Sequence, residues 1–182
     1  MSQLFALIPT DSKYPLLAPV VKHSQKRRDV LKFGLIKHNR IVNRILNQNE
    51  KIKKDYEKTN LDVKSYDFSN PMFNGGVWMY DLDVIRSGLY EDKMRICMEM
   101  QSIDKIFAHN DQGIMNVVFS DFYQLPSEWN SLEFGWKFLT KMPYDLSKIV
   151  HFNGPTKPWS KEIPIWMNRL AVDEWNKYNT EY

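Results

Sequence analysis

Short apolar runs alternate with helical patterns along the chain, and this alternation restricts its fold more than any other feature of the sequence. The apolar runs have the length of buried strands and lie at residues 4–8, 75–80, 132–138 and 148–152. Patterns with helical spacing lie at residues 29–58, 93–106 and 159–178. Strands that alternate with helices predict an α/β fold.

The pattern over 29–58 predicts one long helix with a single apolar stripe. The stripe consists of Leu31, Leu35, Val42, Ile45, Ile52 and Tyr56, and Asn49 also falls on it. Upstream, Pro15 and Pro19 predict a connecting segment rather than an element.

Charge and cysteine content exclude several classes of protein. The 182 residues carry 25 basic and 22 acidic side chains, and a net charge of +3 is too small to indicate a nucleic-acid partner. Cys97 is the one cysteine, so no internal disulfide or cysteine-based zinc site can form. It is expected to be buried and inert. No signal peptide or transmembrane run is evident, so we expect a single cytoplasmic domain over 1–182.

Four segments place polar residues at the ends of apolar runs, where ligands bind in α/β sheets. They are FNGGVWMYDLD (73–83), NDQGIMNVVF (110–119), LPSEWN (125–130) and IVHFNGPTKPW (149–159). In the last, His151 can offer an imidazole nitrogen to a metal, and Gly154 allows the backbone to approach an anion. Lys157 can place a charge on a phosphate. A Gly-Pro surface turn with a solvated lysine is the competing interpretation.

Two of the other segments allow both a functional and a structural interpretation. Asp111 and Gln112, at a predicted helix start, can bind sugar hydroxyls or meet a reacting carbon, or Asp111 can simply cap the helix. Asn74 precedes Gly75, whose small size admits a ligand, but asparagine is equally common in turns.

Asp81 and Asp83 form a carboxylate pair that could hold Mg²⁺ or Mn²⁺. The alternative is that Asp83 caps a helix over 84–89, and we favour it because of where the pair lies relative to FNGG. The tryptophans of the last segment, Trp159, Trp166 and Trp175, are interpreted as core or capping residues rather than as a platform for sugars.

Taken in order, the four segments resemble glycosyltransferase family 8, which includes glycogenin and bacterial lipopolysaccharide galactosyl- and glucosyltransferases. The late motifs of that family are FNSGV-apolar-NLD, DQ-x-apolar-N, LP-x-x-x-N and HF-x-G-x-x-KPW. The resemblance covers about residues 68–160, and residues 29–58 fall in the family's variable acceptor region. It implies a GT-A-like fold, with a mixed sheet flanked by helices.

The resemblance also implies an activity: retaining transfer of a hexose from UDP-glucose or UDP-galactose, with Mn²⁺ or Mg²⁺, to a glycan, lipid-linked or protein acceptor. Position by position, His151 corresponds to a metal ligand. Asn74, Gly75, Gly154 and Lys157 correspond to donor-binding residues, and Asp111 and Gln112 to residues that face the reacting carbon.

The chain departs from the family pattern at several positions. The nucleotide-binding half and its metal-binding DxD have no counterpart, the serine of FNSG is Gly75, and an acid before the DQ pair is Ala108. We therefore expect the C-terminal portion of a family 8 domain, either a truncated gene product or one half of a split enzyme with a separate N-terminal half. The alternative is a truncated or split non-catalytic subunit, a pseudoenzyme that binds a partner through its helices.

Overall fold

The computed structural model describes residues 14, 16–21, 39–61, 63, 71–88, 90–107, 111–132, 134 and 144–178. The chain divides into two compact units, Met1–Leu125 and Pro126–Tyr182, which we call the N-terminal and C-terminal units. Each is described by itself. The run over 4–8, predicted to be a strand, lies outside the described residues.

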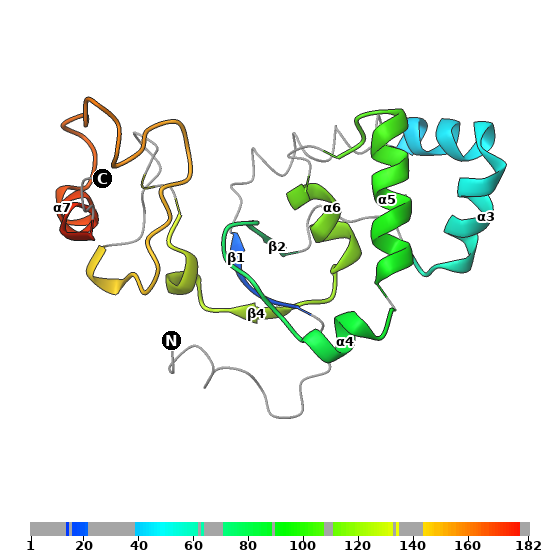
Figure 1. Cartoon of the computed structure of the whole chain (residues 1–182), viewed down its shortest axis with the longest axis horizontal. Coiled ribbons are helices and arrows are strands. Elements are labelled where there is room, and N and C mark those ends of the chain that lie inside the picture. The colour runs from blue at the N-terminus through cyan, green and yellow to red at the C-terminus, as the bar shows by residue number, and fades with distance from the viewer. Residues whose placement is uncertain are drawn as a thin grey trace. The chain divides into compact units, whose positions relative to one another are not determined.

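A small mixed sheet forms the centre of the N-terminal unit (Figure 1). Strand β1 (Leu16–Val21) pairs in parallel with β4 (Tyr123–Leu125). The two-residue strands β2 (Met72–Phe73) and β3 (Met79–Tyr80) pair antiparallel with opposite ends of β1. The expectation of an α/β fold with a mixed sheet flanked by helices is confirmed.

The prediction that Pro15 and Pro19 mark a connector is wrong, because residues 16–21 form the central strand. Pro19 has no N–H to donate, and the register places it opposite Leu125 of β4. Strand β3 pairs with residues 16 and 17 and β2 with residues 20 and 21, so neither reaches Pro19. The missing donor therefore removes no hydrogen bond to either of these partners.

The long helix predicted over 29–58 is two helices within its described part. Residues 39–48 are helical, Asn49 is extended (φ −136°, ψ 93°), and α3 (Glu50–Lys58) follows. The Asn49 side chain accepts a hydrogen bond from the Ile52 N–H at 3.1 Å and so caps α3. The apolar stripe itself is confirmed where it is described, because Val42, Ile45 and Ile52 are all buried. Residues 29–38 lie outside the described part.

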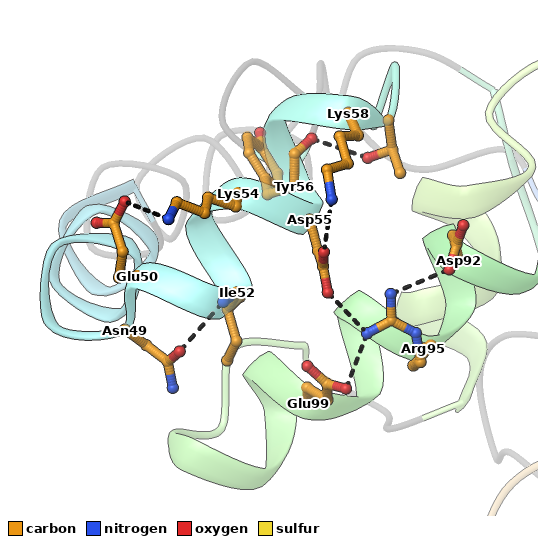
Figure 2. A network of polar contacts seen from close by, with 11 residues as sticks. Asn49, Glu50, Ile52, Lys54, Asp55, Tyr56, Lys58, Asp92, Arg95 and Glu99 are labelled. Carbon is orange, nitrogen blue, oxygen red and sulfur yellow. Dashed lines mark hydrogen bonds and ion pairs between the residues drawn. The ribbon is translucent and has the colours of Figure 1, made fainter.

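A polar network joins α3 to α5 (Glu91–Ile103), as Figure 2 shows. The Arg95 guanidinium lies 3.2 Å from Asp55 on α3, and 3.0 Å from both Asp92 and Glu99 on its own helix. Lys58 contacts Asp55 from the other side at 3.4 Å. One guanidinium thus links the two helices through three carboxylates, one of them on α3.

The helices build outward from the sheet in the order α6 (Asp111–Val118), α5 and α3 (Figure 1). Between them lies a continuous core that includes the fully buried side chains of Phe73, Ile96, Cys97 and Met100. Burial raises the pKa of the Cys97 thiol to about 12, so the expectation of a buried, protonated cysteine is confirmed. Among the described helices, none combines the length and apolar character needed to span a bilayer.

The run over 75–80 is a turn followed by strand β3, not one strand, because Gly75 and Gly76 form the turn. The cap of the next helix, α4 (Leu82–Arg86), also differs from the prediction. Asp81, not Asp83, is the N-cap: its carboxylate accepts hydrogen bonds from the N–H groups of Asp83 (3.0 Å) and Val84 (3.1 Å). Asp83 instead lies in the first turn, where its charge complements the helix dipole.

The C-terminal unit has little regular structure apart from α7 (Arg169–Tyr178), which confirms the helix predicted within 159–178. The short 3₁₀ helices η1 (Ser127–Asn130) and η2 (Tyr144–Leu146) precede it. The strand predicted at 148–152 is reduced to one parallel bridge, between Val150 and Ser131. Residues 132 and 134, the described part of the strand predicted at 132–138, are not in a strand. The core here is formed by the buried side chains of Phe134, Met167, Ala171 and Val172.

Candidate functional site

Asn74, Gly75 and Gln112 come together at the edge of the N-terminal unit's sheet. Gln112 lies in the first turn of α6, and its Oε1 accepts hydrogen bonds from the Asn74 side-chain amide and from the Gly75 N–H, both at 3.0 Å. The Asn74 Oδ1 in turn accepts from the Gly76 N–H at 2.9 Å. The loop after β2 is therefore held against the start of α6 by side chains that the sequence singled out.

Gly75 provides a close approach between this loop and the helix. A Cβ atom at Gly75 would lie 3.6 Å from the Gln112 Cβ, which is ordinary van der Waals contact. Gly75 therefore has room for the small side chain that FNSG proteins carry at this position. Because Gly75 has no side chain, the backbone is more open to a ligand here than it would be with a serine.

Asp111 is the first residue of α6, and its side chain is exposed. Its Oδ1 accepts a hydrogen bond from the Gln112 N–H at 2.9 Å, and this bond orients the carboxylate. The carboxylate of Asp111 therefore lies at the N-terminus of α6, where the helix dipole favours a negative charge.

Asn116, the asparagine of the DQ-x-apolar-N motif, holds this cluster together. It is 2% exposed, its Oδ1 accepts the Phe73 N–H at 2.9 Å, and its Nδ2 donates to the Phe73 carbonyl at 2.9 Å. The same Nδ2 donates to the Gln112 carbonyl at 2.8 Å. One buried amide therefore ties β2 to α6 and sets the position of Asn74 and Gln112. Its signal in the sequence is an asparagine among apolar residues, four positions after Gln112 on the same helix face.

In the C-terminal unit, Gly154 and Lys157 lie on the turn that the sequence predicts. Gly154 has φ of 109°, which only glycine adopts readily, so the Gly-Pro turn is confirmed. The half-buried Lys157 donates through Nζ to the Phe152 carbonyl, and its charge lies 5.9 Å from the centre of the Trp159 ring. The lysine is thus folded back over the turn and not extended into solvent.

His151 lies on the same segment, and Asn130 orients its ring. The His151 Nδ1 is 2.9 Å from the Oδ1 of Asn130, a residue that is 4% exposed at the end of η1. With the Asn130 amide in this orientation its oxygen accepts, which assigns the proton to Nδ1 and leaves the lone pair on Nε2. Burial and the nearby charge of Lys157 lower the pKa of His151, which favours the neutral ring.

These features fit a single metal ligand. A histidine that binds a metal through one nitrogen typically donates its other N–H to a fixed oxygen acceptor, as His151 does to Asn130. Within the described residues, however, no group of three or more histidine, cysteine or acidic side chains is placed to hold a metal. Asp81 is occupied as a helix cap, so among the described residues His151 is a candidate ligand without a closed metal site around it.

Comparison with known proteins places this arrangement in a class. Residues 2–162 match the family model described as Glycosyl transferase family 8. Because this match covers most of the chain, the chain belongs to glycosyltransferase family 8. It is also similar to the lipopolysaccharide 1,2-glucosyltransferase of Escherichia coli, with 29% identity over 123 residues.

That alignment covers 62% of this chain but 35% of the Escherichia coli protein. The chain therefore spans about a third of the length of this curated relative. No solved structure matches the chain at a significant level.

Proposed function

We propose that this chain forms the donor-sugar side of a retaining hexosyltransferase that uses a UDP-hexose. The observation that carries the proposal is the turn at 151–157, where the neutral imidazole of His151 and the ammonium of Lys157 lie either side of Gly154. A flexible glycine flanked by a metal ligand and a cation suits a diphosphate, which is bulky and anionic.

In this proposal, Lys157 neutralises the charge that develops on the diphosphate as the bond to the sugar breaks. His151 would hold Mn²⁺ or Mg²⁺, which when bound shields the negative charge of the same diphosphate. The donor oxygens and residues beyond the described ones would complete the metal coordination.

Asn74, Gly75, Asp111 and Gln112 form the sugar-facing cluster of the proposal. The Gln112 Oε1 already accepts two hydrogen bonds, so its role is to position the loop, and its amide group is the part left to donate to a sugar. The exposed Asp111 carboxylate is then the better candidate to face the reacting carbon.

The family match runs through both compact units, which supports treating 1–182 as one partial domain of the GT-A type. Glucose is the first donor sugar to test, because the Escherichia coli relative is named a glucosyltransferase, and galactose is the second. Its name also makes a lipid-linked glycan the first acceptor class, ahead of other glycans or proteins. A cytoplasmic location and a separate N-terminal half stay predictions.

Because the described residues place no group of three or more potential metal ligands together, we keep a second candidate, a non-catalytic subunit that binds the donor without transferring it. Both candidates bind the donor, and titration of UDP-glucose and UDP-galactose into the chain tests this binding. We expect Lys157→Ala to weaken binding about tenfold and Lys161→Ala, an exposed lysine four residues on, to leave it unchanged. Equal binding by wild type and Lys157→Ala contradicts the proposed donor site. Release of UDP on addition of acceptor separates the enzyme from the non-catalytic subunit.

A further inference from the structure

One face of α7 borders a hollow of about 380 Å³ within the C-terminal unit. Ala171, Glu174, Trp175 and Tyr178 line it, and their spacing of three, four and seven places them on one helix face. The opposite wall comes from η2 and from residues 148–152. The volume lies at the small end of the range for ligand sites, about 300–1,000 Å³, and suits about one or two sugar rings.

Four of the ten residues that line the hollow are aromatic. They are Tyr144, Phe152, Trp175 and Tyr178. Trp175 is 37% exposed and Tyr178 is 77% exposed, so of the core or capping role expected for Trp175 the core role is excluded. Large exposed aromatic surface beside a concavity is a feature of binding sites. The flat face of a ring matches the C–H face of a hexose, whose hydroxyl groups project from its edge.

The polar groups of the hollow suit hydroxyl groups and not phosphates. Asp145 and Glu174 bring two carboxylates, which accept hydrogen bonds from hydroxyls, and Lys148 brings one ammonium. Lys177, the nearby cation on α7, is paired with Glu174 at 2.5 Å. The lining therefore has no excess of positive charge, which disfavours a nucleotide or a phosphorylated sugar.

The hollow is separate from the His151 side chain but linked to the donor turn. Val150 and Phe152, the neighbours of His151 in sequence, line the hollow, and His151 does not. The Trp159 ring lies 4.9 Å from the Trp175 ring, centre to centre, and 5.9 Å from the Lys157 Nζ. A chain of contacts thus runs from the proposed diphosphate-binding lysine to the wall of the hollow.

We propose that this hollow is a saccharide subsite that holds a neutral hexose of the acceptor glycan. Because His151 does not line it, the subsite binds a sugar unit at a distance from the hydroxyl that is glycosylated. Its assignment to the acceptor rests on the proposed function, whereas its preference for a neutral sugar rests on the aromatic and carboxylate lining alone. Ring stacking on Trp175 and hydrogen bonds to Glu174 supply the recognition.

The test is ligand-observed NMR of the full chain with neutral trisaccharides of glucose and of galactose, without nucleotide or metal. Trp175→Ala is expected to weaken binding about tenfold, a loss of about 1.4 kcal/mol. Leu170→Ala, an exposed residue of the same helix outside the hollow, is the matched control and should bind like wild type. Glu174→Gln should weaken binding severalfold and Asp173→Asn, its exposed neighbour, should not.

Three results overturn the proposal. They are no trisaccharide binding by wild type, binding that survives both Trp175→Ala and Tyr178→Ala, and Trp175-dependent binding of UDP or of neutral lipid vesicles in place of the trisaccharide. Tyr178 is so exposed that its replacement leaves folding intact. UDP-hexose binding on the same samples keeps the two proposals apart, because loss of donor binding alone counts against the donor site and not against this subsite.

Discussion

Asn130 orients the ring of His151, because its side-chain oxygen lies 2.9 Å from the Nδ1 atom. Asn130 is buried and His151 is half-buried. The contact joins the end of η1 to the segment that carries Gly154 and Lys157. The two motifs LPSEWN and HFNGPTKPW therefore meet at this contact, where the last residue of the first lies against the Nδ1 atom of His151 in the second.

Removal of this acceptor should redistribute the proton on the His151 ring. We expect wild type to show the Nδ1–H tautomer in long-range ¹H–¹⁵N spectra, and Asn130→Ala to show a mixture of both tautomers. Asn130→Asp restores an acceptor and should restore the Nδ1–H form. A dominant Nε2–H tautomer in wild type contradicts the geometry.

Asn116 should be among the most sensitive polar residues of the N-terminal unit. Asn116→Ala leaves the N–H and carbonyl of Phe73 without partners in a buried setting, at a cost of about 2 kcal/mol or more in the free energy of unfolding. Asn116→Asp should be nearly as damaging, since it removes both donated hydrogen bonds. Asn43→Ala, an exposed asparagine on the helix at 39–48, should change stability by less than about 0.5 kcal/mol. Urea denaturation checks all three, and equal stability of Asn116→Ala and Asn43→Ala contradicts the assignment.

The capping of α4 separates Asp81 from Asp83. Asp81→Ala should lower the free energy of unfolding by about 1 kcal/mol, because two backbone N–H groups lose their acceptor. Asp81→Ser keeps a capping oxygen and should be close to neutral. Asp83→Ala should cost only a few tenths, about 0.3 kcal/mol, through the helix dipole. Thermal unfolding of the three variants tests this difference. A larger loss of stability in Asp83→Ala than in Asp81→Ala contradicts the capping role of Asp81.

The α3–α5 network predicts a pH dependence. Burial alone raises the pKa of Asp55, but hydrogen bonds from Lys58 and Arg95 outweigh it and lower the pKa below its ordinary value of 3.8. Because the folded pKa is depressed, the stabilisation is complete above pH 3.8 and is lost as the pH falls through the folded value. Asp55→Asn should therefore destabilise the chain at pH 7 and approach wild type in strong acid.

The exposed pair of Lys54 and Glu50, 3.9 Å apart, is the control for this network. Lys54→Ala should leave stability unchanged at every pH, as isolated surface pairs contribute little. Denaturant midpoints measured as a function of pH test the difference. A constant gap between wild type and Asp55→Asn down to strong acid is inconsistent with the depressed pKa.

Local patterns predicted much of the helical structure and the grouping of the site motifs. The buried stripe of Val42, Ile45 and Ile52, the helix around Cys97 and the turn at Gly154 depend on spacing or on one residue's conformation, so they can be inferred from sequence. The break at Asn49 could not, because its polar side chain fits a helix surface as well as a cap.

The remaining differences depend on contacts between distant residues. Strand β1, with Pro19 inside it, is recognisable only from its pairing with β2, β3 and β4, which lie at least 50 positions further along the chain. Asn116 acts on Phe73, 43 positions away, and two-residue strands such as β2 have no periodicity to detect. The exposure of Trp175 depends on the packing of the whole C-terminal unit, which no local pattern encodes.

The most direct test of the proposed donor site is the electron paramagnetic resonance signal of Mn²⁺ mixed with the chain, with and without UDP. We predict that the chain sequesters Mn²⁺ when UDP is present, because the donor diphosphate and His151 bind the ion together. His151→Ala should return the signal to that of Mn²⁺ and UDP alone, while Asp81→Asn should behave as wild type. Sequestration that is unchanged in His151→Ala, or lost in Asp81→Asn, contradicts the proposed donor site.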